Sequence, residues 1–302
     1  MSATTSIGFV GIGNMGSPMA ARLAAAGFAV RAFDASAQRL ADFTRDTGVP
    51  AARNLGELAG ASGIVITMLP DSAAVNQVLF GEGDNVSSAL KRGSVVIDMT
   101  SGVPAQTMGF GRRLGAGGVQ MIDAPVSGGV ARARTGELSI MAGGGAAVIA
   151  RCEPVLRAMG TTITRIGGLG AGQAMKALNN LVSAGGFLIG IEALLIGKQF
   201  GLDPALMTDV LNASTGMNNS TQKKFKQFVL ADNFTSGFGL DLMVKDLSIA
   251  LDVGREGGVS TPFAALCREM WAAGAAALGG GQDHTALAKF SEMLAGVRLT
   301  EK

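Results

Sequence analysis

The 302-residue chain holds one histidine, two cysteines and no tyrosine, and each shortage excludes a chemistry. A zinc site built from several histidine and cysteine ligands is nearly impossible when His284, Cys152 and Cys267 are the whole supply. Proton transfer by a tyrosine is excluded outright. The two cysteines have no paired spacing, so we expect reduced structural thiols, no bound metal and a reducing compartment.

The chain also lacks an excess of charge of either sign. Lys and Arg total 25 against 23 Asp and Glu, so neither nucleic acid nor a membrane surface is an expected partner. The 48% apolar content is typical of a well-cored globular protein, and the length favours two domains. The stretch Met1–Ser6, before the first apolar run, is too short and polar for a targeting signal, so we expect a cytoplasmic location.

Short apolar runs alternate with helix-like stretches over residues 7–166, which is the pattern of parallel βαβ units. We expect a helix at Pro18–Ala26, ended by Gly27, and another at Ser72–Phe80, capped by Asp71. The sequence therefore predicts an α/β domain over residues 1–167. The runs expected to be strands are Ile7–Val10, Ala29–Phe33, Ile64–Met68, Val95–Ile97, Met121–Ile122, Ser139–Ala142 and Ile163–Ile166.

The pattern changes after Gly172, where Gln173 to Phe200 indicates one long helix. Its stretch Leu181–Gly197 is apolar enough to raise the question of a membrane span, but Glu192 and four glycines favour a buried helix. We expect this helix to join the first domain to an all-α substrate and dimerisation domain over residues 168–302. The further helices expected are Pro204–Asn212, Thr221–Leu230, Leu240–Glu256 and Thr261–Leu278.

The alanine-rich segment Ala272–Ala277, beside Trp271, permits close approach of two helices. The segment fits an intramolecular core. It also fits a subunit interface, because so apolar a helical domain in a small chain would bury part of its surface against a second subunit. We expect a homodimer or a homotetramer.

A glycine-rich turn follows the first expected strand, at Gly11-Ile12-Gly13-Asn14-Met15-Gly16. In a dinucleotide site the first glycine allows the tight turn, the second lets the backbone approach a pyrophosphate, and the third lets helix and strand pack closely. The start of the following helix offers free N–H groups to the phosphates. A carboxylate, Asp34, ends the second strand at the distance expected for a ribose contact. It favours NAD, although Arg31 and Arg39 leave NADP open as an alternative.

Two further segments have the composition of a substrate site. Lys176 and Asn180 lie one turn apart on the long helix, and a lysine on an apolar helix needs a partner or a task. Burial lowers the pKa of a lysine toward neutrality, which suits proton transfer. Ser127 and the backbone N–H groups of Gly128 and Gly129 are suited to bind a carboxylate.

Five ordered motifs carry a family resemblance across nearly the whole chain. The sequence resembles the β-hydroxyacid dehydrogenases, a 6-phosphogluconate dehydrogenase-like family that includes 3-hydroxyisobutyrate dehydrogenase and tartronate semialdehyde reductase. The motifs are GIGNMGSPMA from Gly11, DMTS from Asp98, DAPVSGG from Asp123, GAGQAMKALNN from Gly170, and Lys245-Asp246-Leu247.

The resemblance implies a Rossmann-like NAD-binding domain, an all-helical domain and an active site between them. It implies that Lys176 is the catalytic acid and base, that Asn180 positions the substrate, and that Ser127, Gly128 and Gly129 hold its carboxylate. It further implies that the cofactor is lined by Met68, Leu69, Pro70, Thr100, Ser101 and Lys245. If Lys245 has no such role, it is expected to be a surface lysine paired with Asp241.

The implied function is hydride transfer between NAD and a small β-hydroxy acid such as 3-hydroxyisobutyrate. Reduction of a short semialdehyde, tartronate or succinic, is the alternative, and a dinucleotide-binding module without turnover is a remote one. The loop Ser214–Ser220 lacks the arginine or aromatic residue that some relatives place near the substrate. Met217, Asn218 and Asn219 therefore indicate an uncharged substrate contact or a plain helix cap. We expect His284 to be solvated at a helix start capped by Asp283.

Overall fold

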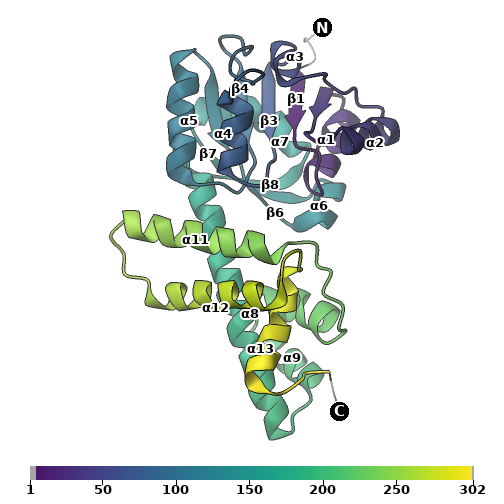
Figure 1. Ribbon diagram of the computed structural model, residues 1–302, viewed down its shortest axis with the longest axis vertical. Coiled ribbons are helices and arrows are strands. Elements are labelled where there is room, and N and C mark those ends of the chain that lie inside the picture. Colours follow the sequence, from purple (N-terminus) through teal and green to yellow (C-terminus); the bar gives the residue numbers. More distant parts are fainter. Residues whose placement is uncertain (1–4, 301–302) are drawn as a thin grey trace. The chain divides into compact units, whose positions relative to one another are not determined.

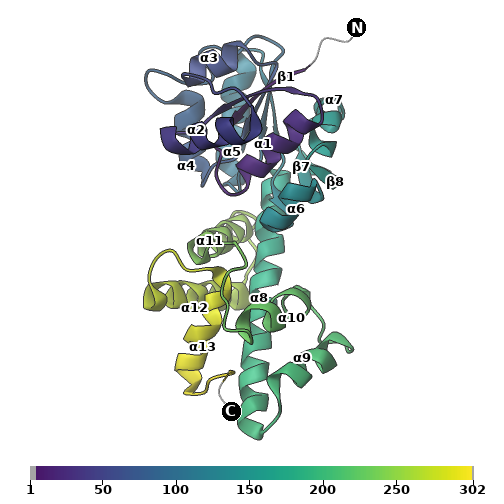
Figure 2. The same ribbon diagram turned by 90° about the vertical axis from the view of Figure 1, so that its right-hand side faces the viewer.

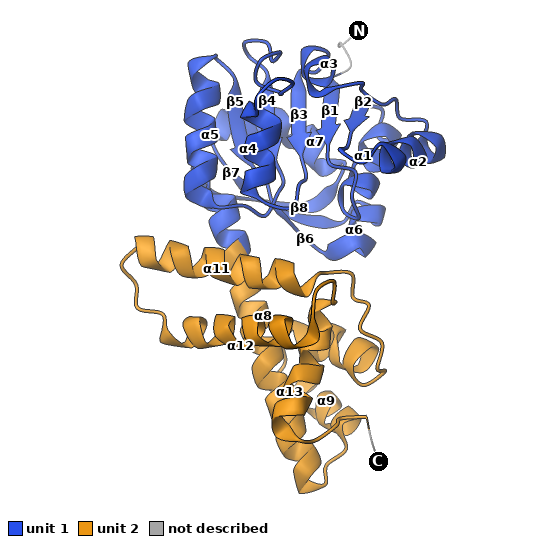
Figure 3. Ribbon diagram, viewed as in Figure 1, with its two compact units in different colours: residues 1–176 blue, residues 177–302 orange. Residues whose placement is uncertain are grey.

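The computed structural model describes residues 5–300, so Met1–Thr4 of the expected short polar start lie outside it. The chain divides into two compact units, Met1–Lys176 and Ala177–Lys302 (Figure 3). Unit 1 holds a sheet whose strands are β1 (Ser6–Val10), β2 (Ala29–Phe33), β3 (Ile64–Thr67), β4 (Val95–Asp98), β5 (Gln120–Asp123), β6 (Val126–Ser127), β7 (Leu138–Gly143) and β8 (Gly160–Gly167) (Figure 1). Its helices are α1 (Gly16–Ala25), α2 (Ala37–Thr47), α3 (Leu55–Gly60), α4 (Ser72–Phe80), α5 (Pro104–Ala116), α6 (Gly129–Thr135) and α7 (Ala146–Arg157).

The sheet has the order β2-β1-β3-β4-β5-β7-β6, and β8 pairs with β7. All seven expected strands are present, and the pairs from β2 to β5 are parallel. The expectation of parallel pairing fails at β7, which runs antiparallel to β5 and to the two-residue strand β6. β6 is not predicted because two residues carry no periodicity. The Rossmann-like fold class is confirmed.

Successive side chains of a strand point to opposite faces of the sheet, so the strands contribute to two hydrophobic cores, one on each face. Ile7 and Phe9 of β1 pack with α1 and α7, whereas Val10 packs on the other face with α3 and α4. Every described residue of β3 and β4 is buried, as expected for strands covered on both faces. The loops after β1, β3 and β4 therefore emerge side by side at the carboxyl edge of the sheet.

Unit 2 is all-helical, as expected, and is built on α8 (Ala171–Phe200), whose first residues belong to unit 1. α9 and α10 lie on one side of α8, and α11, α12 and α13 lie on the other (Figure 2). The helices after α8 are α9 (Pro204–Asn212), α10 (Asn219–Lys223), a π-helix (Phe225–Val229), α11 (Leu240–Glu256), α12 (Pro262–Leu278), a 3₁₀ turn (His284–Ala286) and α13 (Leu287–Ala295).

Among residues 5–300, α8 alone is long and apolar enough to cross a membrane, and 56% of its most apolar window is buried. Phe187, Ile191 and Leu194 on this helix are fully buried in the core of unit 2. The alanine-rich part of α12 also faces this core through Trp271 and Gly274, where an added Cβ would lie 2.3 Å from Leu287. α8 is thus built as the central core helix of unit 2.

Two local expectations in unit 2 are corrected. The helix expected at Thr221–Leu230 is broken into α10 and a π-helix, with Lys224 between them. His284 is only 4% exposed, and its ring stacks on Trp271 at 6.3 Å, so it is not a solvated residue. Asp283 does cap the 3₁₀ turn, accepting from the backbone N–H of Thr285.

Candidate active site

The glycine loop after β1 has the geometry of a dinucleotide turn. Gly11 has a φ of +99°, and a Cβ there would lie 2.3 Å from the carbonyl oxygen of Met68. A Cβ on Gly16 would lie 1.8 Å from the carbonyl oxygen of Gly11, so this position fixes the close contact of α1 with the turn. A Cβ on Gly13 meets nothing within 4 Å, which leaves its backbone open to a ligand. The three glycines thus have the steric surroundings that a dinucleotide turn requires.

Asp34 follows β2 and points back at this loop. Its carboxylate accepts hydrogen bonds from the backbone N–H of Ile12 at 2.7 Å and of Ser36 at 2.8 Å. The Arg39 guanidinium pairs with the same carboxylate at 3.1 Å, whereas Arg31 is paired with Glu57. The carboxylate therefore lies beside the glycine turn, and one of the two nearby arginines already contacts it.

The remaining cofactor-lining candidates of unit 1 lie on neighbouring loops at the same edge. Met68, Leu69 and Pro70 follow β3, and Thr100 and Ser101 follow β4. The hydroxyl of Thr100 accepts a hydrogen bond from the backbone N–H of Leu69 at 3.0 Å, which ties the two loops together. The structure thus brings these candidates to the edge where the glycine loop lies.

The candidate carboxylate loop begins where β6 ends. Ser127 pairs with Ser139 of β7, and the backbone then turns through two residues of positive φ, +134° at Gly128 and +66° at Gly129. An added Cβ would collide with the side chain of Arg132 at Gly128 but would meet nothing within 4 Å at Gly129. The second glycine therefore leaves its backbone accessible, as a substrate-binding loop requires.

Two buried carboxylates hold the start of α8, just before Lys176. Asp123, at the end of β5, accepts from the backbone N–H of Gly170 at 2.7 Å and of Gln173 at 2.8 Å. Asp98, at the end of β4, accepts from the side chain of Gln173 at 3.0 Å. Burial raises the pKa of both carboxyls, that of Asp98 to about 6. Lys176 is half-buried one turn after Gln173.

In unit 2 a partner of Asn180 is Asp246, a residue of the motif Lys245-Asp246-Leu247 for which the sequence predicts no role. The Asn180 amide donates to the Asp246 carboxylate at 2.5 Å, and both side chains are buried. Lys245 lies 3.5 Å from the other oxygen of this carboxylate, so Asp246 is an acidic neighbour of this lysine. The adjacent Lys-Asp pair in the sequence is the signal that points to this contact.

The loop Ser214–Ser220 ends in a helix cap, one of the two alternatives that its sequence left open. The Asn218 side chain accepts from the backbone N–H of Ser220 and Thr221 and donates to the Gly186 carbonyl at 3.3 Å. Met217 is 52% exposed, and its sulfur accepts from Gln222. Of the two alternatives for this loop, the structure shows the cap.

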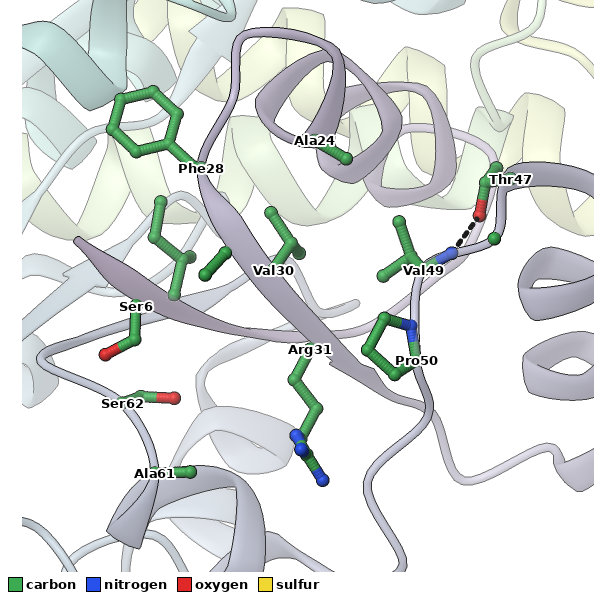
Figure 4. A pocket seen from close by; sticks show the side chains of 13 residues that line it. Ser6, Ala24, Phe28, Val30, Arg31, Thr47, Val49, Pro50, Ala61 and Ser62 are labelled. Carbon is green, nitrogen blue, oxygen red and sulfur yellow. Dashed lines mark hydrogen bonds between the residues drawn. The ribbon is translucent and has the colours of Figure 1, made fainter. Parts of the chain in front are cut away.

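A cavity of about 410 Å³ opens at the amino ends of β1 and β2, away from the glycine loop at their carboxyl ends (Figure 4). Its walls include Phe28, Val30, Val49 and Pro50, and the charged Arg31 in its lining is paired with Glu57 at 2.7 Å. The cavity contains none of the candidate site residues.

Both cysteines are free and buried, and burial raises the pKa of each thiol to about 11. They are structural thiols, as expected. Within residues 5–300, no group of three or more His, Cys, Asp or Glu side chains is placed to hold a metal ion.

Two family models match the chain, and the boundary between the two matches lies just before α8. Residues 6–168 match the NAD binding domain of 6-phosphogluconate dehydrogenase, and residues 170–291 match the family described as NAD-binding of NADP-dependent 3-hydroxyisobutyrate dehydrogenase. The first match covers the glycine loop and Asp34, and the second covers Lys176 and Asn180.

Similar proteins span the full chain. It is 37% identical to 2-(hydroxymethyl)glutarate dehydrogenase of Eubacterium barkeri, over 99% of both chains. It is 34% identical to 2-hydroxy-3-oxopropionate reductase of Escherichia coli, over 97% of this chain and 99% of the relative. The solved structure of Mycobacterium tuberculosis 3-hydroxyisobutyrate dehydrogenase with L-serine has a TM-score of 0.87 and 31% identity, covering 95% of this chain and 99% of that one.

Proposed function

Because the chain belongs to the β-hydroxyacid dehydrogenase family of NAD(P)-binding oxidoreductases, we propose that it transfers hydride between NAD and a small β-hydroxy acid, with Lys176 as the acid and base. The observation that carries this proposal is the start of α8, where two buried carboxylates anchor the helix that carries Lys176. Such an anchor holds a proton-transfer group in a fixed place, which efficient acid–base catalysis requires.

The roles of the other residues follow from their chemistry. Ser127, Gly128 and Gly129 bind the substrate carboxylate, and Asn180, held by Asp246, orients the reacting hydroxyl. During oxidation the Lys176 amine takes the hydroxyl proton, and during reduction its ammonium returns a proton to the forming alkoxide. The nicotinamide, when bound, accepts or supplies the hydride.

NAD is the proposed cofactor in preference to NADP. The Asp34 carboxylate lies beside the glycine loop, where it would accept ribose hydroxyls and repel a 2′-phosphate. Arg39, which is 3.1 Å from this carboxylate, offsets part of the repulsion and keeps NADP usable. Lys245 is proposed to contact the cofactor from unit 2.

The substrate is tested by initial rates of NADH production at alkaline pH. The panel contains 3-hydroxyisobutyrate, 2-(hydroxymethyl)glutarate, L- and D-serine, glycerate, L-threonate and 4-hydroxybutyrate, with NADP run in parallel. Turnover of one β-hydroxy acid with NAD supports the proposal. Turnover only in the reverse direction, with tartronate or succinic semialdehyde and NADH, favours the semialdehyde reductase. Tight cofactor binding without turnover of any compound favours the non-catalytic module.

We also propose that unit 2 associates with a second copy of the chain, as a homodimer or within a homotetramer. Val182, Ile189 and Ile196 recur at seven-residue intervals on α8 and are 77%, 57% and 72% exposed. A seven-residue repeat of branched side chains is the spacing with which two helices pack along their length.

We propose a cytoplasmic location for the protein. The buried free thiols fit the reducing environment of that compartment.

A further inference from the structure

The segment after the capped loop docks on α8 through two glycines. Gly186 faces Asn218, and an added Cβ would lie 3.4 Å from its amide. Gly190 faces Phe225, where an added Cβ would lie 2.6 Å from the ring. The backbone between these two contacts includes α10 and Lys224, the last residue before the π-helix. Small residues on α8 thus bring a lysine up against this helix.

Lys224 lies over a polar position of α8. Its ammonium donates to the hydroxyl of Ser183 at 3.2 Å and lies 5.9 Å from the centre of the Phe187 ring. Burial is the main cause that lowers the pKa of His284, and the positive charge of Lys224 adds to it. A half-buried ammonium in this position therefore has a hydroxyl and an aromatic face beside it, and a neutral histidine nearby.

Ser183 continues the row of polar side chains that carries the proposed chemistry. It follows Asn180 by three residues, so the two share one face of α8 and are separated by about 4.5 Å along the axis. That distance matches the few carbon atoms between the hydroxyl and the distal carboxylate of a short dicarboxylic hydroxy acid. Asn180 itself is held by Asp246. Through its contact with Ser183, Lys224 therefore places a cation at the face of α8 that also carries Asn180.

We propose that Lys224 and Ser183 form a second anion subsite, which binds a distal carboxylate, or another acidic group, of the substrate. This rests on the proposed function and narrows its substrate to β-hydroxy acids that carry two negative groups. The distal acidic group accepts hydrogen bonds from the Lys224 ammonium and the Ser183 hydroxyl. A hydrogen bond from a lysine ammonium to a carboxylate is charge-assisted and therefore stronger than one between neutral groups.

The test compares two substrates that share the reacting end. 2-(Hydroxymethyl)glutarate and 3-hydroxyisobutyrate have the same hydroxymethyl and carboxylate groups, and the first has an additional carboxylate. The variant Lys224→Met removes the charge and keeps most of the stem. Its matched control is Lys223→Met, at the exposed neighbouring lysine. Calorimetric binding of glutarate and butyrate to the NAD-loaded enzyme gives a readout that needs no turnover.

We expect Lys224→Met to lower kcat/KM for the dicarboxylate about 10- to 100-fold, and that for the monocarboxylate less than about threefold. Ser183→Ala should give a smaller loss in the same direction, and Lys223→Met none. Retained turnover of 3-hydroxyisobutyrate shows that each variant is folded. Equal binding of glutarate and butyrate, unchanged in Lys224→Met, overturns the subsite. Absence of turnover by the wild-type enzyme, with glutarate still bound through Lys224, would instead refute the proposed reaction and leave the subsite standing.

Discussion

The side-chain amide of Gln173 donates to the Asp98 carboxylate at 3.0 Å and so joins the first turn of α8 to the end of β4. The amide oxygen of Gln173 accepts from Thr107 at 2.7 Å, which fixes the orientation of the amide. Thr67 also donates to Asp98, and the carboxyl is fully buried. Because Asp98 contacts both Thr67 and Gln173, a change in its ionisation affects the contacts that hold the start of α8.

Replacement of Asp98 by Asn should change how stability depends on pH. Burial raises the folded-state pKa of Asp98 from 3.8 to about 6. Between these values the folded chain holds a proton that the unfolded chain has lost, so the free energy of unfolding falls as pH rises and levels off above pH 6. We expect this fall, about 1–3 kcal/mol, to be absent in Asp98→Asn. Urea titrations from pH 4 to 7 measure it. Parallel curves for Asp98→Asn and wild type would refute the assignment, and Asp241→Asn, at an exposed carboxyl, is the control.

Replacement of Lys176 by Ala should stop turnover and leave cofactor binding intact. A positioned acid–base group contributes about 10²–10⁴ in rate, so kcat is expected to fall at least about 100-fold. The Kd for NAD, measured by fluorescence titration, should change less than about threefold. Lys198→Ala, farther along α8, is the matched control and should retain full activity. Near-normal turnover of Lys176→Ala would rule out the assigned role.

Gly13 and Gly16 should respond oppositely to Ala substitution, although they belong to one turn. A methyl group on Gly13 has open space around it, so the free energy of unfolding should fall by less than about 0.5 kcal/mol. The Kd for NAD should rise at least about tenfold, because the pyrophosphate needs that space. A methyl group on Gly16 would meet the Gly11 carbonyl oxygen, and overpacking of this kind costs about 1–3 kcal/mol. Urea unfolding and NAD titration on both variants separate the two effects. Similar losses of stability in both would show that this steric account is wrong.

Asp34→Asn should weaken the preference for NAD. The amide retains an oxygen for the Ile12 N–H but no longer repels a 2′-phosphate. We expect the ratio of kcat/KM for NAD over NADP to fall at least about tenfold. Arg39→Ala should change this ratio in the opposite direction, because the cation that offsets the carboxylate is removed. A ratio unchanged in both variants would mean that the preference is set elsewhere.

The sequence predicted features that depend on local spacing. The three glycines and Asp34 lie at the carboxyl ends of the first two strands, where a motif and a strand pattern are sufficient to place them. The long helix begins at Ala171, two residues before its expected start at Gln173, because Asp123 binds the N–H groups of its first turn. The boundary between the compact units lies after Lys176, nine residues beyond the boundary expected after residue 167. It lies there because the first turn of α8 is bound to the ends of two strands of the sheet.

Contacts between distant segments could not be predicted in the same way. Lys224 and Ser183 are 41 positions apart and meet only because glycines on α8 admit the π-helix. His284 is buried because the backbone near Phe238 pairs with it and Trp271 stacks on it. The row of polar residues at 176, 180 and 183 on an apolar helix was the available signal, and it marks the face of α8 without showing what covers it.

Ile189→Asp should disrupt the proposed association of two chains. The stripe of Val182, Ile189 and Ile196 exposes branched apolar side chains along α8, and a carboxylate in its middle would be buried without a partner in a dimer. We expect a dissociation constant at least about 100-fold higher, seen as a shift to monomer mass in light scattering at a fixed concentration. Val259→Asp places the same charge at another exposed apolar residue and should leave the mass unchanged. A wild-type chain that is monomeric at high micromolar concentration would refute the interface, because the stripe would then be exposed to solvent and would bind no second chain.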